Sequence, residues 1–511
     1  MTRTTSSVWS PEKLPRLGTP LDHDLKTEVC VVGGGIAGLT TGYLLASRGH
    51  SVVLLEANDT IGSGETGFTT AHLAWVFDDR FARVSAIRGD DATRAASDSH
   101  RSAIALIEKI AQRERIDCDF EWLDAYLFAG TDGPEAIEKE VETLRRIGMP
   151  FERLGKPPFG DLPGPCLRFA GHAHFHPMKY LAGLAKGFRG LGGTLHTGTR
   201  VRRIEGGDSC TVTTKEGRTV RANSVVVATN SPFDAGAILH TKLAAYTTYA
   251  LAFSIPRGVV PHALFWDTED PYHYVRIHPG VGEKEFLIVG GEDHKTGQAD
   301  DQAIRWHRLE SWTRARLPDA GPVEHHWSGQ VFETPDGLGL IGAAPWGRNL
   351  YVITGDSGMG MTHGTLGAKL LVNLIRGQDD PLAAIYDPSR WMTWALRTFL
   401  GENLNLAAQY RDWFTGGDVK SVDQIPPGHG AIVRRGLTKL AVYKENDGSV
   451  CEMSATCRHL GALVRWNPGE QTWDCPAHGS RYSCDGKVLH GPAHEDLKPV
   501  EEPVAAHAAK R

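Results

Sequence analysis

Hydrophobic and polar positions form distinct blocks near the start of the chain. Residues 29–32 (VCVV) and 52–55 (VVLL) are short, uniformly apolar runs, which are typical of strands buried on both faces of a parallel sheet. A longer run with helical character lies between them and starts in a glycine-rich turn. The pattern therefore predicts a strand, a turn, a helix and a second strand, in that order.

The predicted turn has the spacing G-x-G-x-x-G. Gly33 would make the tight turn, Gly35 would let the backbone approach a pyrophosphate, and Gly38 would let helix and strand pack closely. The start of the helix would then face the negative charge. Glu56 ends the second strand, where an acidic side chain can bind the ribose hydroxyls of an adenosine. Together these features predict a bound dinucleotide.

In later segments, the spacing of hydrophobic residues first predicts helices and then strands. Residues 91–115 and 134–148 predict amphipathic helices, the second of which ends at Gly148. Residues 243–330 are rich in β-forming residues, with YHYVRI and EFLIVGG as predicted neighbouring strands.

A polar helix is predicted over residues 388–414, and we place a domain boundary just after it, near Gly416. A chain of 511 residues is too long for one ordinary core, and its length suggests about three domains. We expect an N-terminal arm (1–27), a large unit (28–415) and a C-terminal domain (416–511). The arm has no apolar segment of the kind found in a secretory signal, so we do not interpret it as one. We expect it to be a poorly ordered arm that packs late.

Composition narrows the class of protein. Hydrophobic residues make up 41% and charged residues 23% of the chain, as in a soluble globular protein. The formal net charge of −6, without a long basic run, argues against a nucleic-acid partner. No apolar stretch approaches the roughly 18 residues needed to span a bilayer, so no transmembrane segment is expected.

Near the C-terminal end, two Cys-His pairs are separated by fifteen residues. They are Cys457 with His459 and Cys475 with His478. Four such residues could hold zinc, but zinc sites usually space a pair of cysteines by two to four residues, whereas each pair here is mixed. The pattern resembles the Rieske family over residues 416–511. That resemblance implies a small all-β domain in which the four residues ligate a 2Fe-2S cluster, with a reduction potential of roughly −150 to +300 mV.

Other positions refine this resemblance. Ala462 and Ala477 stand where respiratory Rieske proteins carry a disulfide, which implies a ferredoxin-like domain in the cytoplasm. Ser480 and Tyr482 match hydroxyl residues that donate hydrogen bonds towards cluster sulfurs and raise the potential. We expect an apolar contact surface around the imidazoles, made of Ala462, Leu463, Pro476 and Ala477. The remaining cysteines show no paired spacing and are expected to be reduced thiols: Cys30, Cys118, Cys166, Cys210, Cys451 and Cys484.

Three segments of the large unit resemble the FAD enzymes of the D-amino acid oxidase and glycine oxidase superfamily. They are the glycine-rich turn with the loop at 57–67, the run VVVATN at 225–230, and the strand, turn and helix that start at residue 350. The resemblance implies an α/β fold with FAD as cofactor. A Rossmann-like FAD-binding domain would be built from about 28–85, 170–240 and 328–385, and an interrupted α+β substrate domain from about 86–169 and 241–327.

The same resemblance implies the cofactor contacts. The helix that starts near residue 360 would point at the flavin ring and stabilise its anionic reduced form. The residues implied to contact FAD are Gly33, Gly35, Ile36, Ala37, Gly38, Glu56, Thr70, Ala71, Val201, Thr229, Gly358, Met359, Gly360 and Met361.

Candidates for catalysis are fewer. Arg276 lies in a strand that carries a carboxylate-binding arginine in several members of the superfamily, although a surface ion pair is the alternative. His72 lies in a loop that passes the flavin ring, and it could attach FAD covalently, contact flavin or substrate, or be structural. His294 and Tyr249 are further candidates, each with simple packing as the alternative.

The combined pattern predicts an oxidoreductase that takes a hydride from a carbon next to nitrogen in an amino acid or related amine. Electrons would pass from FAD through the cluster to an external carrier such as a ferredoxin or a quinone. Two alternatives stay open. The cluster could instead feed electrons to a reductase or monooxygenase, or the protein could be an electron-transfer or redox-sensing module without a substrate.

Overall fold

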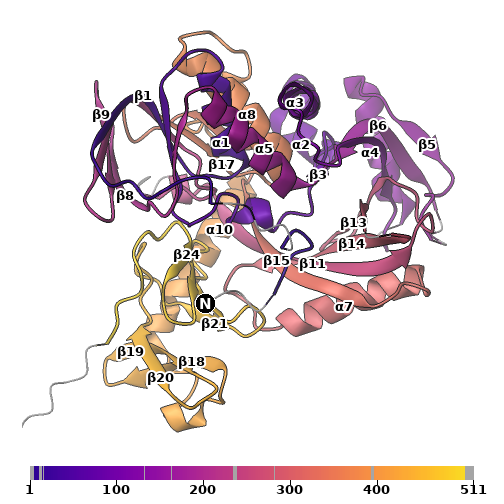
Figure 1. Ribbon diagram of the computed structural model, residues 1–511. Coiled ribbons are helices and arrows are strands. Elements are labelled where there is room, and N and C mark those ends of the chain that lie inside the picture. Colours follow the sequence, from indigo (N-terminus) through magenta and orange to yellow (C-terminus); the bar gives the residue numbers. More distant parts are fainter. Residues whose placement is uncertain are drawn as a thin grey trace, which may run out of the picture. The chain divides into compact units, whose positions relative to one another are not determined.

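The computed structural model divides into two compact units (Figure 1). The larger unit comprises residues 5–295 and 303–403, and the smaller unit includes 296–302 and the chain from 404 onward. This division falls inside a helix and earlier than the boundary that we predicted near Gly416. The structure describes residues 5–10, 14, 16–131, 133–160, 162, 164–233, 239–280, 282–392 and 396–500.

The first sheet of the larger unit has a parallel centre. Its strand order is β16-β17-β10-β1-β2-β7, with β16 antiparallel at one edge and a β8–β9 hairpin attached to β10. The predicted strand, helix and strand at residues 29–55 are confirmed at its centre. The elements are β1 (Leu25–Val32), β2 (Val52–Leu55), β7 (Thr194–His196), β8 (Val201–Glu205), β9 (Cys210–Thr214), β10 (Thr219–Val227), β16 (Leu340–Ala343) and β17 (Leu350–Thr354).

Helices cover this sheet because its strands are apolar on both faces. In Figure 1, α1 and α8 lie side by side against it, and α3 and α5 pack beside them. The bounds of these helices are α1 (Ile36–Ala46), α3 (Asp90–Glu114), α5 (Pro177–Gly190) and α8 (Gly360–Ile375). The helix predicted over 91–115 is thus confirmed as α3.

The second sheet of the larger unit is mixed, with the order β15-β11-β14-β13-β12-β4-β6-β3, and β5 pairs with β6. Both predicted neighbouring strands, β13 and β14, are confirmed as an antiparallel pair in which Arg276 faces Ile288. The strands are β3 (His72–Leu73), β4 (Glu121–Phe128), β5 (Glu152–Leu154), β6 (Cys166–His174), β11 (Ala244–Pro256), β12 (Leu264–Asp267), β13 (His273–Pro279), β14 (Lys284–Lys295) and β15 (Val323–Glu333).

Shorter helices complete the larger unit. α4 ends at Gly148, whose φ of 71° gives the left-handed conformation that glycine adopts freely, as predicted. Leu309 and Trp312 of α7 pack into one apolar cluster of the second sheet. The remaining bounds are α2 (Phe81–Arg88), α4 (Pro134–Ile147), α7 (Gln302–Arg316), α9 (Ala383–Tyr386) and η1 (Glu65–Gly67).

The N-terminal arm differs from our expectation in its described part. Trp9 is 1% exposed, and its indole N–H donates to the Thr69 carbonyl at 2.6 Å. Ser6 forms a β-bridge with His326. An indole that is buried and hydrogen-bonded holds this part of the arm in the core of the larger unit.

The smaller unit contains two antiparallel sheets, which confirms the predicted all-β domain. α10 (Leu396–Gln409) and η3 (Tyr410–Phe414) precede them. One sheet follows the short helix η4 (Val422–Gln424) and consists of β18 (His429–Arg435), β19 (Thr438–Lys444) and β20 (Val450–Ser454). The other sheet consists of β21 (Arg465–Asn467), β22 (Thr472–Asp474), β23 (Arg481–Ser483) and β24 (Val488–His490).

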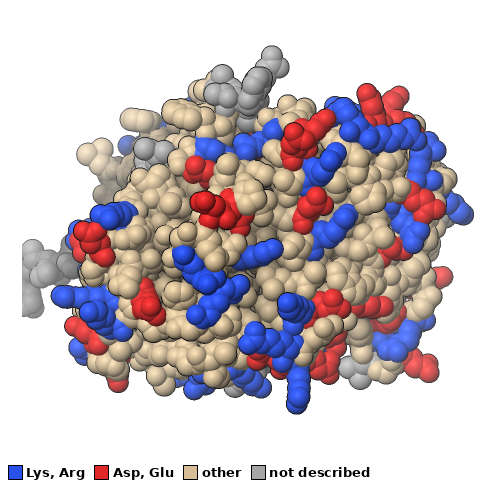
Figure 2. Space-filling model, turned by 90° about the horizontal axis from the view of Figure 1, so that it is seen from above, with Lys and Arg blue, Asp and Glu red and all other residues tan. Residues whose placement is uncertain are grey.

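Charged side chains of both signs are mixed over the face shown in Figure 2. The formal net charge of −6 is therefore not concentrated there. Among the helices that the structure describes, none has both the length and the apolar composition needed to cross a bilayer.

Candidate cofactor and substrate sites

The turn between β1 and α1 leaves no room for side chains. Gly33 has a φ of 114°, and a Cβ there would lie 2.3 Å from the Ala228 carbonyl oxygen. A Cβ on Gly38 would lie 1.9 Å from the Gly33 carbonyl oxygen. Both distances are far below van der Waals contact, so the close approach of strand and helix requires glycine at both positions.

The start of α1 is open to an anion. Its N-cap residue is Gly35, which makes no side-chain cap, and its first turn carries no acidic residue. The Ile36 amide donates to the Thr66 hydroxyl at 3.2 Å, and the other amides of this turn, together with the helix dipole, attract a phosphate. Glu56 lies against the same turn, where its carboxylate accepts the Gly34 amide at 2.7 Å and the Asn58 amide at 2.8 Å. Burial raises the pKa of Glu56. These residues fit the pyrophosphate and ribose of a dinucleotide.

A second uncapped helix start lies at α8. Gly358 is exposed and has a φ of 84°, and no described side chain caps the helix at Met359. Met359 and Met361 are 7% and 5% exposed and join the apolar core. The exposed backbone here therefore belongs to Gly358, whereas the methionine side chains pack inward. An uncapped helix start fits the anionic ring of a reduced flavin.

Two other predicted FAD contacts lie elsewhere in the first sheet. Thr229 follows the Ala228 peptide that touches Gly33, and its hydroxyl donates to the Ser231 carbonyl at 3.0 Å. Val201 starts β8, and its side chain is 4% exposed in an apolar cluster. Thr229 thus lies close to the glycine turn, while only the backbone of Val201 is left for a ligand.

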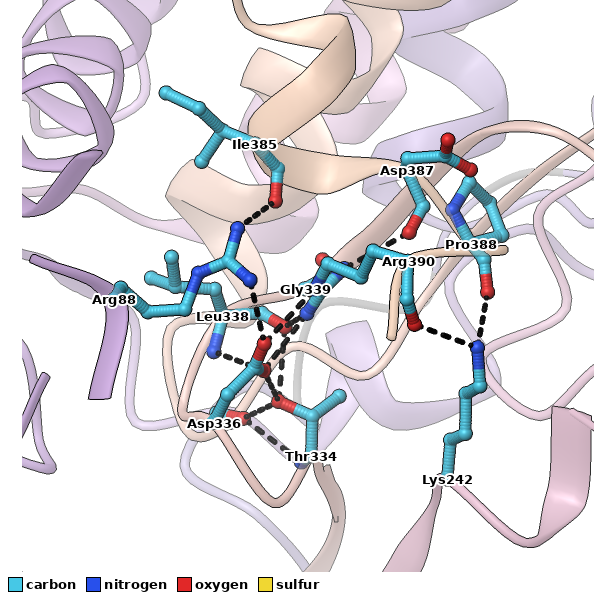
Figure 3. Close-up of polar contacts among 11 residues, drawn as sticks. Arg88, Lys242, Thr334, Asp336, Leu338, Gly339, Ile385, Asp387, Pro388 and Arg390 are labelled. Atoms are coloured by element: carbon cyan, nitrogen blue, oxygen red, sulfur yellow. Dashed lines mark hydrogen bonds and ion pairs between the residues drawn. The ribbon is translucent and has the colours of Figure 1, made fainter. Parts of the chain in front are cut away.

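A polar network holds the framework beside α8 (Figure 3). The Asp336 carboxylate, which is buried, accepts two hydrogen bonds from Arg390, at 2.9 and 2.8 Å, and lies 3.4 Å from Arg88. Arg390 also donates to the Gly339 carbonyl at 2.8 Å. A Cβ on Gly339 would lie 1.8 Å from the His363 ring of α8. The ion pair therefore fixes the turn that packs directly on this helix.

The four predicted cluster ligands lie together in the smaller unit. The His459 and His478 rings have centroids 4.9 Å apart and are nearly perpendicular. Cys457 and Cys475 are buried, and a hydrogen bond from the Cys475 thiol is the main cause that lowers the pKa of Cys457 to about 6. None of the eight cysteines forms a disulfide. Two thiols and two imidazoles in one place fit a 2Fe-2S cluster.

Both hydroxyl residues that we predicted beside the sulfurs are in place. The Tyr482 hydroxyl lies 3.2 Å from the Cys457 sulfur. The Ser480 hydroxyl accepts the Ala493 amide at 3.0 Å, and its own hydrogen bond lowers the pKa of Cys457. Each hydroxyl can donate to a sulfur that gains negative charge on reduction.

The prediction of an apolar contact surface around the imidazoles is wrong for three of its four residues, and the fourth, Ala477, is half-buried. Ala462 and Leu463 are 1% and 3% exposed and pack into the core of the smaller unit, and Pro476 is also buried. The exposed apolar side chain beside a ligand is instead Leu460, at 44%. The side chains after Gly461 turn inward because the first ligand loop closes on itself, with the Cys457 amide donating to the Ala462 carbonyl at 2.8 Å.

Two family models match the chain, one for the FAD dependent oxidoreductase (DAO) family over residues 28–374 and one for the Rieske [2Fe-2S] domain over residues 416–501. The chain belongs to the FAD-dependent oxidoreductase family. Its second matched region makes it an oxidoreductase with a C-terminal Rieske domain.

Relatives agree with this assignment. YhfW of Bacillus subtilis, named as a Rieske 2Fe-2S iron-sulfur protein, is 30% identical over 491 residues, which cover 94% of each chain. Gamma-glutamylputrescine oxidoreductase of Escherichia coli is 26% identical over 74% of this chain and 90% of its own. The fold of this oxidoreductase is similar to that of glycine oxidase from Geobacillus kaustophilus, with a TM-score of 0.59, 22% identity, and coverage of 72% of this chain and 99% of the other.

Arg276 of the oxidoreductase is already engaged by the protein. It is 0% exposed, and its guanidinium donates to the Ala71 carbonyl at 2.8 Å and to the Thr70 carbonyl at 3.1 Å. Its Nε donates to the Ile277 carbonyl at 3.2 Å. Burial lowers the pKa of Arg276 to about 9. This geometry favours a role in holding the Thr70–Ala71 loop, in which Ala71 has a φ of 59°, and does not support binding of a substrate carboxylate.

His72 lies beside the same loop and is half-buried. Its Nδ1 is 3.1 Å from the Thr70 hydroxyl, and its ring meets Tyr274 edge-on with centroids 5.5 Å apart. Burial and the nearby charge of Arg276 lower the pKa of His72 to about 3. The imidazole is therefore neutral at physiological pH. The structure thus brings together two of the predicted catalytic residues, Arg276 and His72.

The other two predicted catalytic residues form a separate pair. The rings of Tyr249 and His294 stack with centroids 5.7 Å apart. Tyr249 is 0% exposed in the apolar cluster that includes α7 residues. Its neighbour on β11, Thr248, instead accepts or donates a hydrogen bond at 2.9 Å with the Tyr274 hydroxyl. Successive strand residues face opposite sides of a sheet, so Tyr249 lies on the face away from Tyr274 and His72, and its surroundings favour a packing role.

Four acidic residues were not predicted from the sequence as part of the site that includes His72 and Tyr274. Burial raises the pKa of Glu333 to about 8, of Asp78 and Asp356 to about 7, and of Asp293 to about 6. The negative charges of Asp293 and Asp356 raise the pKa of Asp78 further, and the Tyr272 hydroxyl donates to Asp78 at 2.9 Å. All four keep part of their surface open. None of the four was a sequence candidate, although Asp356 lies in the glycine-rich turn before α8 and Asp293 directly precedes the candidate His294.

Proposed function

We propose that this oxidoreductase is a cytoplasmic dehydrogenase that oxidises an amine, or an amino acid, at a carbon next to nitrogen. When bound, the flavin supplies the hydride acceptor and the cluster supplies a one-electron path to an external carrier such as a ferredoxin or a quinone. The observation that carries the proposal is that one chain holds both complete sets, the glycine turn with Glu56 and the four cluster ligands.

An amine is favoured over an amino acid as the substrate. Arg276 has no free donor pair for a carboxylate because backbone carbonyls engage it. Asp78, Asp356 and Glu333 are partly open carboxylates, and no described Lys, Arg or His forms an ion pair with any of them. A cationic amine would offset their mutual repulsion. The Escherichia coli relative is named after gamma-glutamylputrescine, a compound that contains an amine, and this name is in keeping with the choice of an amine.

Proton handling also follows from these groups. An ammonium ion must lose a proton before its neighbouring carbon can give up a hydride. Asp78 has a pKa near neutral and is oriented by the Tyr272 hydroxyl, so it is suited to take that proton. His72 is neutral and lies close to Tyr274, so it can orient substrate without adding positive charge.

Anaerobic mixing with a panel of diamines, monoamines and amino acids tests the proposal. Bleaching of the flavin by an amine, followed by appearance of the reduced cluster signal, is the expected result. Bleaching by dithionite alone would contradict it and favour a module without a substrate. If amino acids bleach the flavin and amines do not, the amine preference is wrong while the dehydrogenase assignment stands.

A further inference from the structure

A short segment between β14 and α7 belongs to the smaller unit and closes over the second ligand loop. It comprises residues 296–302. Gly297 has a φ of 72°, and a Cβ there would lie 2.9 Å from the Pro476 nitrogen and 3.0 Å from the Asp474 carbonyl oxygen. The segment therefore lies against the backbone that carries Cys475, and this contact requires glycine.

Gln298 makes the specific contact. Its side-chain N–H donates to the Pro476 carbonyl at 3.0 Å and to the Asn405 side-chain oxygen at 2.7 Å. Asn405 donates back to the Gln298 oxygen at 3.1 Å. The reciprocal amide pair uses both ends of the Gln298 carboxamide and fixes its orientation towards the ligand loop.

The peptide that Gln298 contacts leads directly to a cluster sulfur. Pro476 and Ala477 stand between the ligands Cys475 and His478, and the Ala477 amide donates to the Cys475 sulfur. Donation to a peptide carbonyl polarises that peptide and makes its N–H a stronger donor. The route therefore runs from the Gln298 amide through the Pro476–Ala477 peptide to the sulfur.

The first ligand loop is held in a similar way by side chains that precede residue 416. The Tyr410 hydroxyl donates to the Leu460 carbonyl, and the Trp413 indole N–H donates to the Gly461 carbonyl, both at 3.0 Å. Arg465 joins the two sides, since it donates to the Asp412 carboxylate at 2.7 Å and to the Gly297 carbonyl at 3.4 Å. Both ligand loops are thus held by residues outside the region that the Rieske model matches.

We propose that Gln298 is a positioning residue that raises the reduction potential of the cluster by strengthening the Ala477 hydrogen bond to the Cys475 sulfur. Reduction adds negative charge to the sulfurs, and stronger donors stabilise it. The inference concerns the cluster alone and holds whatever the substrate is.

Redox titration of the full-length holoprotein, followed by circular dichroism and electron paramagnetic resonance of the cluster, tests this role. Gln298→Leu keeps the size of the side chain and removes its donor. The equilibrium constant for reduction should fall about threefold to tenfold, or roughly 30 to 60 mV at ~59 mV per tenfold for one electron. Asn405→Ala leaves Gln298 in place without its partner, so a smaller shift in the same direction is expected. The double variant should shift no further than Gln298→Leu.

Gln302→Leu is the matched control. Gln302 lies in the same segment, but its amide donates to the Ala299 carbonyl within the segment. An unchanged potential in Gln298→Leu would overturn the proposal, and so would an equal shift in Gln302→Leu, because the fold of the segment and not the hydrogen bond would then set the potential. If Gln298→Leu fails to assemble the cluster, Asn405→Ala decides: a lowered potential supports the proposal and an unchanged one refutes it. Bound FAD should stay constant in all variants.

Discussion

The two cofactor sites of this oxidoreductase are built in opposite ways. The dinucleotide turn offers backbone, and its requirement is the absence of side chains at Gly33 and Gly38. The cluster site offers side chains, and its requirement is four ligand atoms from two loops. One substitution at a ligand removes an irreplaceable bond, whereas most substitutions around the turn remove one contact among many. The two sites should therefore differ in how steeply they respond to change.

The largest effect is expected at the cluster. His478→Ala removes one of two imidazoles from an iron, and the neighbouring imidazole, His459, is already a ligand. The variant should lose the cluster while FAD stays bound, because the two ligand sets share no residue. Iron and labile sulfide analysis, together with the flavin absorbance, measures both. Simultaneous loss of flavin would show that the two sites are coupled in folding.

The next effect concerns the framework of the flavin site. Asp336→Ala leaves Arg390 and Arg88 without their buried carboxylate and should lower the free energy of unfolding of the larger unit by about 3 to 5 kcal/mol. Asp208→Ala, which breaks an exposed pair with Arg348, is the control and should change it by less than about 1 kcal/mol. Chemical denaturation followed by flavin fluorescence compares the two. Equal effects would mean that Asp336 does not anchor the turn on α8.

Glu56 tests the side-chain part of the dinucleotide site. Glu56→Ala removes a charge-assisted acceptor and should weaken FAD binding by about 1.5 to 3 kcal/mol. Gly34 and Asn58, whose amides donate to Glu56, would also lose their partner. Flavin release on dilution measures the change. Unchanged occupancy would mean that the backbone of the turn alone carries the affinity, which would sharpen the contrast with the cluster.

The smallest effect is a dependence on pH at the acidic group. The pKa of Glu333 in the folded protein, about 8, lies above its ordinary value. Stability is therefore lost as the pH rises from that ordinary value to about 8. Glu333→Gln should therefore stabilise the FAD-loaded protein by about 1 kcal/mol at pH 9 and by little at pH 5. Thermal unfolding at both values measures the difference. Equal changes at both would show that Glu333 is not a repelled carboxylate.

Sequence patterns predicted the cofactor-binding residues, but not the roles of the residues around His72. The glycines of the turn lie within one short stretch of sequence and the cluster ligands within another, so local spacing indicated their chemistry. Arg276 could not be assigned in this way, because the carbonyls of Thr70 and Ala71 that engage it lie about 200 positions earlier. The carboxylates at 78, 293, 333 and 356 come from separate segments, and only the tertiary fold brings their charges together.

The smaller unit showed the same limit. Residues 457–478 carried a complete pattern, yet nothing in 296–302 indicated that Gln298 would meet Pro476. Apolar spacing near the ligands also misled us, because Ala462 and Leu463 are small and apolar whether they face solvent or core, and the closed loop turns them inward.

The hydrogen bonds that Gln298, Tyr410 and Trp413 donate to the ligand loops have a consequence for any fragment or graft of the Rieske domain. A fragment cut at residue 416 would keep every ligand, yet it would lose three hydrogen-bond donors to the backbone that presents them. The region from residue 416 onward therefore does not contain everything that positions the cluster ligands. Grafting it onto another flavoprotein would transfer the iron ligands without the donors that position their loops.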